Sequence, residues 1–209
     1  MMMYDFICST LALHSITRTT NTLIFKGQCM AAMDLSKMGT AKVVLNTSDC
    51  NQIVIEKWPV SDVEWAFYLY AATELNQAGI ATPTLLSADA TLRKLRLEYI
   101  PYKVDQTAVA NDYAIAMLGR LHRYPANSEW LYHTYTWTET ALENALMLLA
   151  LPEKNARQLR RFQQNSNALF ACQSLVSGDS NAGNWGRRES GNLVLFDWER
   201  FGKGSPAID

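Results

Sequence analysis

A short loop near the end of the 209-residue sequence carries the residue types that transfer of a phosphoryl group requires. Residues 177–184 read Ser-Gly-Asp-Ser-Asn-Ala-Gly-Asn, which places Asp179 and Asn184 five positions apart, and Asp197 follows the apolar run 193–196. One carboxylate can accept the proton of an attacking hydroxyl, while an amide oxygen and a second carboxylate can hold the Mg²⁺ ions that neutralise phosphates. The pattern therefore predicts Asp179 as a catalytic base, with Asn184 and Asp197 as metal ligands.

The same loop has a simpler interpretation. Its Asp, Asn and Ser residues are typical of Asx turns in surface loops, and Asp197 could be an ordinary residue at a strand end. Gly178 and Gly183 allow the tight turns that both interpretations need. We favour the chemical interpretation because the apolar run, which reads as a buried strand, follows the loop and ends in Asp-Trp-Glu, residues 197–199.

An upstream lysine fits the same chemistry. Two β-rich runs, residues 41–45 and 52–57, flank a turn-rich segment, which predicts a β-hairpin. Because strand side chains alternate, Ile53, Ile55 and Lys57 share one face of the second strand. A lysine that ends an apolar strand face can anchor phosphates, although a surface lysine is the commoner explanation for such a strand taken alone. The downstream loop motif favours the phosphate-binding role.

A helix is predicted over residues 63–77, with Ser61 or Asp62 as its N-cap. Helical spacing predicts that its core face consists of Trp65, Leu69, Ala72 and Leu75. Glu64 lies in the first turn, where its carboxylate either pairs with Lys57 or only complements the helix dipole. Further helices are predicted over residues 111–124, 138–149 and 152–173.

Composition and charge exclude several classes of protein. A net charge of −1, without a basic tail, gives no reason to expect a nucleic-acid or membrane-surface partner. The four cysteines form no C-x-x-C pair, which argues against a zinc site and suits a reducing cytosol. The sequence contains no recognisable signal peptide or transmembrane helix. We therefore expect a cytoplasmic protein of one domain or two small lobes that binds neither nucleic acid nor membrane.

The spacing G-D-x-x-x-x-N at residues 178–184, followed by D-W-E at residues 197–199, resembles the aminoglycoside phosphotransferase and choline kinase family. Residues 98–101, Glu-Tyr-Ile-Pro, resemble the hinge of that family. In such a hinge the backbone reads adenine through its amide and carbonyl groups. The resemblance therefore implies cofactor-binding roles for the backbone at Glu98 and Ile100.

The resemblance also implies a fold and a function. The fold is expected to be α+β and protein-kinase-like, with a nucleotide-binding N-lobe over residues 1–101 and a helical C-lobe over residues 102–209. Lys57 and Glu64 would bind the nucleotide. The cofactors would be ATP and Mg²⁺. The partner would be a small molecule that offers a hydroxyl group, such as an aminoglycoside, choline or ethanolamine.

The sequence departs from the family pattern in three places. Ser177 stands where the family usually has His, which is expected to loosen the loop. Thr19, Thr20 and Asn21 stand where a phosphate-covering loop would carry glycines. The sequence ends with residues 204–209, whereas family members continue with D-L-A and several helices. We therefore expect a truncated C-lobe without its C-terminal helices, partly exposed apolar helix stripes, and an acceptor site that the sequence does not reveal.

Three functions follow as hypotheses. The leading one is an ATP- and Mg²⁺-dependent phosphotransferase acting on a hydroxyl of a small molecule. The second is a nucleotide-binding pseudoenzyme or inactive truncated fragment, and the third is a non-enzymatic interaction domain whose motif is coincidental. Binding of Mg²⁺-ATP separates the first two from the third, and phosphoryl transfer separates the first from the second.

Overall fold

The computed structural model describes residues 32–36, 41–47, 52–109 and 111–209. They belong to one compact unit that spans residues 31–209. The predicted phosphate-covering loop around Thr19, Thr20 and Asn21 lies outside the described residues.

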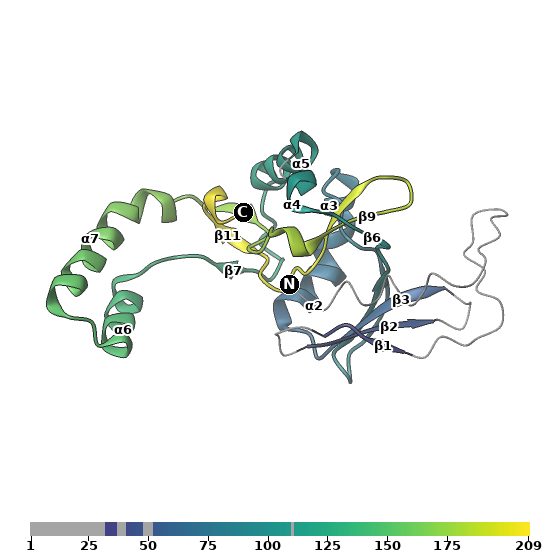
Figure 1. Cartoon of the computed structure of the whole chain (residues 1–209), viewed down its shortest axis with the longest axis horizontal. Coiled ribbons are helices and arrows are strands. Elements are labelled where there is room, and N and C mark those ends of the chain that lie inside the picture. The colour runs from purple at the N-terminus through teal and green to yellow at the C-terminus, as the bar shows by residue number, and fades with distance from the viewer. Residues whose placement is uncertain (1–31, 37–40, 48–51, 110) are drawn as a thin grey trace. The chain divides into compact units, whose positions relative to one another are not determined.

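The first described elements form a five-stranded antiparallel sheet (Figure 1). Its strands, in spatial order, are β1 (Met33–Asp34), β2 (Lys42–Thr47), β3 (Ile53–Trp58), β5 (Lys94–Glu98) and β4 (Leu85–Asp89). β2 and β3 pair along their whole length, which confirms the predicted hairpin. On the central strand β3, Lys57 lies opposite Val43 of β2 and Leu95 of β5. This central position buries Lys57, which excludes the surface-lysine alternative.

The predicted helix after β3 is present, but its middle turn is not α-helical. It consists of α2 (Asp62–Ala66), a π-helical turn η1 (Phe67–Ala71) and α3 (Ala72–Gln77). The Ser61 side chain caps it by accepting a hydrogen bond from the N–H of Glu64 at 3.2 Å. A π turn holds more residues than an α turn. The side chains that follow it therefore point in directions rotated from those that regular α-helical spacing predicts.

The prediction of the core face is therefore wrong in part. Ala72 and Leu75 are buried as predicted, and Trp65 is half-buried, but Leu69 is 38% exposed. The π turn instead directs three other side chains into the core, those of Phe67, Tyr68 and Ala71.

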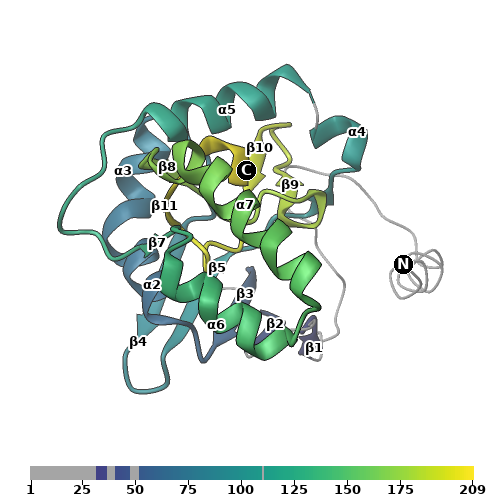
Figure 2. The same cartoon turned by 90° about the vertical axis from the view of Figure 1, so that its left-hand side faces the viewer.

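The later part of the chain is helical up to the loop motif, as predicted (Figure 1). Its helices are α4 (Gln106–Val109), α5 (Asp112–Arg123), α6 (Glu139–Leu149) and α7 (Glu153–Phe170). Figure 2 shows α6 and α7 side by side as a helical hairpin. Among the expected exposed stripes, Met147 and Leu148 of α6 are largely exposed, whereas Phe170 is half-buried. No helix in the described part of the chain is both long and apolar enough to cross a membrane.

Two small sheets hold the loop motif and the segment after it. One has the order β10-β9-β6 and the other the order β7-β11-β8. Their strands are β6 (Tyr102–Lys103), β7 (His133–Thr134), β8 (Ser174–Val176), β9 (Trp185–Arg187), β10 (Leu193–Leu195) and β11 (Gly202–Gly204). Residues 177–184 connect β8 to β9, and Asp197 follows β10. The predicted site residues thus lie on strands and their connections, except Glu64, which lies on α2, and the whole is α+β as predicted.

An aromatic cluster joins the helix after β3 to the segment after β10. The rings of Phe67 and Trp198 are stacked, with centroids 4.4 Å apart, and Phe201 packs edge-on against Phe67 at 5.0 Å. The Trp198 indole N–H donates to the carbonyl of Leu195 at 2.9 Å. All three rings are almost fully buried. This packing fixes the position of the Asp-Trp-Glu segment relative to α2.

The π turn predicts a difference between two leucines of this helix. Leu75→Ala should lower the free energy of unfolding by about 2–5 kcal/mol, because it removes a fully buried side chain and leaves a cavity. Leu69→Ala should cost less than about 1 kcal/mol, because that side chain is partly in solvent. Urea denaturation followed by circular dichroism gives both values. Equal losses would show that the segment is a regular α-helix with Leu69 in the core.

Candidate functional site

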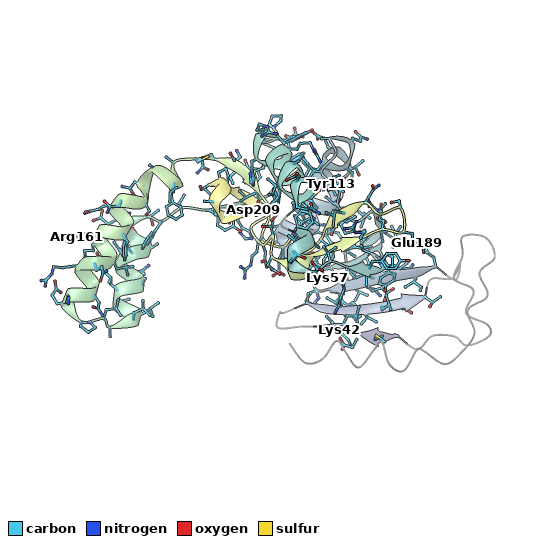
Figure 3. The ribbon with its side chains drawn as sticks, turned by 45° about the horizontal axis from the view of Figure 1, so that its top comes forward. Lys42, Lys57, Tyr113, Arg161, Glu189 and Asp209 are labelled. Atoms are coloured by element: carbon cyan, nitrogen blue, oxygen red, sulfur yellow. The ribbon has the colours of Figure 1, made fainter. Side chains whose placement is uncertain are left out.

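Lys57, which Figure 3 labels, is the residue that the other side chains of the candidate site surround. Its ammonium nitrogen is 2.8 Å from the carboxylate of Glu64 and 2.7 Å from Oδ1 of Asp197. An oxygen of a third carboxylate, that of Glu199, lies 4.0 Å from the same nitrogen. The four side chains come from β3, α2 and the segment after β10, so elements far apart in the sequence meet at one charge. Glu64 thus pairs with Lys57, which was one of its two predicted roles.

Burial and the neighbouring charges shift the pKa values of Lys57 and Glu64 in opposite directions. Burial raises the pKa of Glu64 to about 7, and the Lys57 ammonium only partly offsets that rise. Burial also disfavours the charged form of Lys57, but the carboxylates of Glu64 and Asp197 outweigh it, so the pKa of Lys57 lies above its ordinary value. Lys57 is therefore a cation at neutral pH, whereas Glu64 changes its charge close to neutrality.

Three carboxylates form the part of the site that suits a metal ion. Oxygen atoms of Glu64, Asp197 and Glu199 lie within 4.8 Å of one another, and oxygen is the ligand that Mg²⁺ prefers. Asp197 is a predicted ligand, but Glu199 is not. Residues 197–199 lie outside any strand and Asp197 has a φ of +67°, so strand alternation does not predict Glu199; an acidic residue two positions after Asp197 is the signal in the sequence that could have identified it.

The connection between β8 and β9 holds the other two predicted residues together. Asn184 is buried, and its Nδ2 donates to the backbone carbonyl of Asp179 at 2.9 Å. Because its amide nitrogen binds the loop, the amide oxygen of Asn184 is the atom left for a cation. Phe196 donates its backbone N–H to the carbonyl of Asn184 at 2.9 Å, which ties the loop to the residue before Asp197. The Asp179 carboxylate is half-buried and accepts a hydrogen bond from Asn181 Nδ2.

Asp209 anchors this loop, although no sequence motif predicted it. Its side chain is fully buried. Oδ1 accepts hydrogen bonds from Ser177 Oγ at 2.7 Å and from the Gly178 N–H at 3.0 Å, and Oδ2 accepts one from the Ser177 N–H at 2.9 Å. His122 Nε2 lies 3.0 Å from Oδ2. Ser177 thus binds Asp209 through both its hydroxyl and its backbone N–H, and the loosening of the loop expected from its presence stays a prediction.

The turn at Gly178 requires glycine. Its φ is +78°, and a Cβ at this position would come within 2.3 Å of both the Arg200 carbonyl oxygen and the Tyr135 hydroxyl. The Tyr135 hydroxyl donates to that same carbonyl at 2.6 Å. The backbone of the loop therefore packs directly against the segment that follows Asp197.

The side chain of Glu98 has a structural role in the predicted hinge. It accepts hydrogen bonds from Arg188 at 2.6 and 2.8 Å and from the N–H and hydroxyl of Thr84 at 3.0 Å. Burial disfavours its charged form, but these partners outweigh burial and hold the pKa of Glu98 below its ordinary value. Its backbone N–H donates to the carbonyl of Thr84 at 2.9 Å. The adenine-binding roles of the backbone at Glu98 and Ile100 stay predictions.

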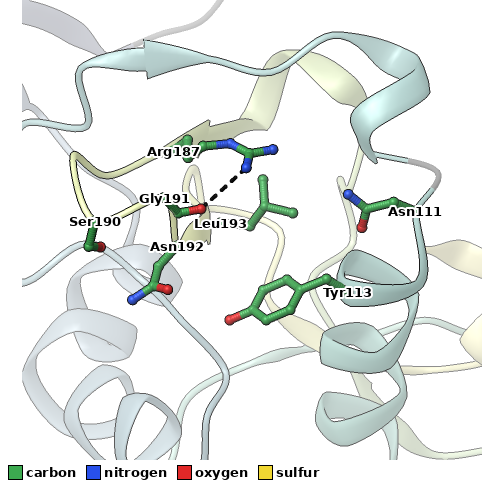
Figure 4. A pocket seen from close by; sticks show the side chains of 7 residues that line it. All are labelled: Asn111, Tyr113, Arg187, Ser190, Gly191, Asn192 and Leu193. Atoms are coloured by element: carbon green, nitrogen blue, oxygen red, sulfur yellow. Dashed lines mark hydrogen bonds between the residues drawn. The ribbon is translucent and has the colours of Figure 1, made fainter.

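A separate open cavity of about 330 Å³ lies between the start of α5 and the β9–β10 turn (Figure 4). Tyr113, Arg187 and Asn192 are among the residues that line it. Arg187 Nη1 donates to the carbonyl of Gly191 at 3.4 Å across one wall. None of the predicted site residues lines this cavity, so it is distinct from the Lys57 site.

No protein-family model matches the chain, and no curated protein matches it. Solved structures of small-molecule kinases do share its fold. Choline kinase LicA from Streptococcus pneumoniae aligns with a TM-score of 0.57 and 15% identity, over 86% of this chain and 66% of that one. The streptomycin-ATP-APH(2")-IIa ternary complex aligns with a TM-score of 0.60 and 18% identity, over 87% of this chain and 69% of that one. Amicoumacin kinase hAmiN in complex with AMP-PNP, Ca²⁺ and Ami aligns with a TM-score of 0.56 and 17% identity, over 84% of this chain and 60% of that one.

These structures confirm, at the level of the fold, the resemblance to the aminoglycoside phosphotransferase and choline kinase family. The fold is a kinase-like two-lobe α+β fold. The chain spans 66% of the length of the choline kinase and 60% of that of the amicoumacin kinase.

The anchoring of the loop by Ser177 is testable. Ser177→Ala should lower the free energy of unfolding by about 1–3 kcal/mol, because it removes a buried hydrogen bond to the Asp209 carboxylate. Ser190→Ala, in the exposed β9–β10 turn, is the matched control and should change stability by less than about 0.5 kcal/mol. Thermal denaturation of both variants measures the effect. A Ser177→Ala variant as stable as the control would show that the hydroxyl does not anchor the loop.

The raised pKa of Glu64 predicts a pH dependence of stability. In the unfolded chain its pKa is the ordinary 4.5, and in the folded protein it is about 7. The folded state therefore holds the proton more tightly. This favourable contribution is complete below about pH 4.5 and is lost as pH rises to about 7, with a total on the order of 3 kcal/mol.

Glu64→Gln removes this titration. The variant should therefore gain stability relative to the parent protein as pH rises from 5 to 8, in urea denaturation at each pH. Glu153→Gln on the exposed surface of α7 is the control, and its difference from the parent should stay constant. A constant difference for Glu64→Gln as well would show that the pKa of Glu64 is not raised.

Proposed function

We propose that the chain binds ATP with Mg²⁺ and transfers a phosphoryl group to a hydroxyl of a small molecule. The observation that carries this proposal is the pairing of Lys57 with both Glu64 and Asp197, at 2.8 and 2.7 Å, in a fold shared with small-molecule kinases. A buried lysine between a helix carboxylate and a second, partly exposed carboxylate offers a fixed positive charge beside a cation site. Nucleotide phosphates with their metal ion need both.

The geometry supports the roles proposed for the residues around Lys57 and in the loop. Lys57 would contact the phosphates, and the buried Glu64 would hold the Lys57 ammonium in place. Asp197, with Glu199 beside it, and the amide oxygen of Asn184 would hold Mg²⁺, which supplies positive charge to the phosphates when bound. A base in a loose transition state mainly orients the hydroxyl and takes its proton late, which a carboxylate can do.

Asp179 is the proposed base. The hydrogen bond from Asn184 fixes the backbone of Asp179, and that from Asn181 orients its carboxylate. The half-buried carboxylate remains reachable by a hydroxyl group of the acceptor.

The remaining assignments complete the proposal. The backbone at Glu98 and Ile100 would read adenine at a boundary between an N-lobe over residues 1–101 and a C-lobe over residues 102–209. The acceptor would be a small molecule, since the similar kinases are named for choline, an aminoglycoside and amicoumacin. We propose a cytoplasmic location, where ATP is abundant. A chain that binds nucleotide without transferring phosphate is the second candidate.

Nucleotide binding tests the proposal directly. ATP with Mg²⁺ should raise the melting temperature, because binding to the folded state alone stabilises it by about 2.7 kcal/mol at a hundredfold excess over Kd. Asp197→Ala should abolish the Mg²⁺-dependent part of the shift. Glu189→Gln, in the exposed β9–β10 turn, should leave it unchanged. If millimolar ATP with Mg²⁺ leaves the parent melting temperature unchanged, the chain is not a nucleotide-binding protein.

Asp179→Asn separates the two candidate functions. It keeps the shape of the side chain and removes the base, so it should abolish phosphoryl transfer while the ATP-induced shift persists. Lys57→Ala should impair both, because it removes the phosphate contact. A parent that binds Mg²⁺-ATP but transfers phosphate to none of a panel of aminoglycosides, choline and ethanolamine would favour the second candidate.

A further inference from the structure

The predicted hinge, residues 98–101, is fastened at its first residue by an arginine that lies far along the chain. Arg188 Nε donates to Oε1 of Glu98 at 2.6 Å, and Arg188 Nη2 donates to Oε2 of Glu98 at 2.8 Å. Nη2 also donates to the backbone carbonyl of Thr82 at 3.0 Å. Two parallel contacts to one carboxylate are the strong and geometrically specific way in which arginine binds this group. The two side chains are only 26% and 24% exposed, so solvent screens this pair less than an ordinary surface ion pair.

The backbone that carries this arginine is itself held in place. Arg188 follows β9 directly, at the start of the turn to β10. Its N–H donates to the carbonyl of Asn192 at 3.0 Å, and its carbonyl accepts from the N–H of Gly191 at 2.9 Å. The turn is therefore closed by hydrogen bonds on both sides of Arg188. Glu98 is thus bound by a guanidinium that extends from an ordered backbone.

The same segment, residues 185–188, also contacts the rest of the hinge. β6 begins at Tyr102, directly after the hinge, and pairs antiparallel with β9. In the middle of the hinge, Ile100 lies against the buried Gly186 of β9, where an added Cβ would come within 2.6 Å of Ile100 Cγ2. A glycine within a strand allows such a close approach. One short segment therefore contacts the hinge through Glu98 at its start, through Ile100 in its middle and through β6 at its end.

We propose that residues 185–188 set the shape of the hinge, and that Arg188 is a positioning residue that orders the hinge backbone through Glu98. A backbone that is already ordered can present its amide and carbonyl groups to a planar base at a smaller entropic cost, and such preorganisation raises affinity. The hold of this segment on the hinge does not depend on the proposed function; only its consequence for adenine rests on that function.

Backbone order parameters from nuclear magnetic resonance test this hold in the protein without nucleotide. Arg188→Ala should lower the order parameters of Tyr99 and Ile100 from about 0.85, typical of ordered backbone, toward about 0.6. Arg187→Ala is the matched control, because it removes the same charge one position earlier from a side chain that lines the separate cavity (Figure 4). The control should leave both order parameters unchanged. Unchanged values in Arg188→Ala, or an equal fall in both variants, would overturn the proposal.

Calorimetric titration with two ligands tests the consequence for adenine. Mg²⁺-tripolyphosphate carries the three phosphates of Mg²⁺-ATP without the base. Arg188→Ala should raise the Kd of Mg²⁺-ATP about tenfold, as expected if the ordered hinge falls to about a tenth of the molecules, and should leave that of Mg²⁺-tripolyphosphate unchanged. Arg187→Ala should change neither Kd.

The remaining outcomes are decisive as well. An equal loss of affinity for both ligands, or no loss for either, would overturn the role of Arg188 in adenine binding. If Arg188→Ala does not fold, Arg188→Lys takes its place, because lysine keeps the charge but cannot make the two parallel contacts. If the parent binds neither ligand, the proposed function fails, whereas the order parameters still decide whether residues 185–188 hold the hinge.

Discussion

A buried ammonium must be paired, and the pairing of Lys57 is the constraint on which the candidate site depends. Removing a charge from water costs several kcal/mol, and only close opposite charges recover it. Glu64 and Asp197 provide them from two elements that meet only in the folded chain. Lys57 is therefore paired only when the sheet, the helix after β3 and the segment after β10 pack together. The contacts that form the site are thus part of the packing of the fold.

The aromatic packing behind the site makes this closure possible. Trp198 lies between the two acidic residues of the Asp-Trp-Glu segment and is stacked against Phe67 of the helix. The indole is buried, whereas the carboxylates of Asp197 and Glu199 on either side of it are partly exposed, and Asp197 pairs with Lys57. Apolar burial thus provides the free energy that holds several negative charges close together, which their mutual repulsion would otherwise oppose.

The loop motif is held by a second buried charge. The Asp209 carboxylate accepts three hydrogen bonds from Ser177 and Gly178, with His122 beside it. Ser177 contributes both its hydroxyl and its backbone N–H to this network. At 15–18% identity, what the chain has in common with these similar kinases is the fold.

The residues that carry the proposed chemistry could be predicted because their signals are local. The spacing of Asp179, Asn184 and Asp197, and the strand alternation that points to Lys57, depend only on neighbours in the sequence, as do the hairpin and the helix caps. The contacts of these residues depend on chain segments more than a hundred positions apart, as for Lys57 and Asp197. Only tertiary structure could decide which role Glu64 takes.

The same reason explains what sequence reasoning missed. The π turn exposes Leu69 and buries Tyr68, and its first residue, Phe67, stacks on Trp198. No periodicity within the helix records this long-range contact. The role of Asp209 depends on a loop some thirty residues earlier, reached only when η3 (Pro206–Ile208) folds back on β8. Local spacing in the sequence therefore determined which residue types are available for chemistry, whereas long-range burial of charge and aromatic surface decided their partners.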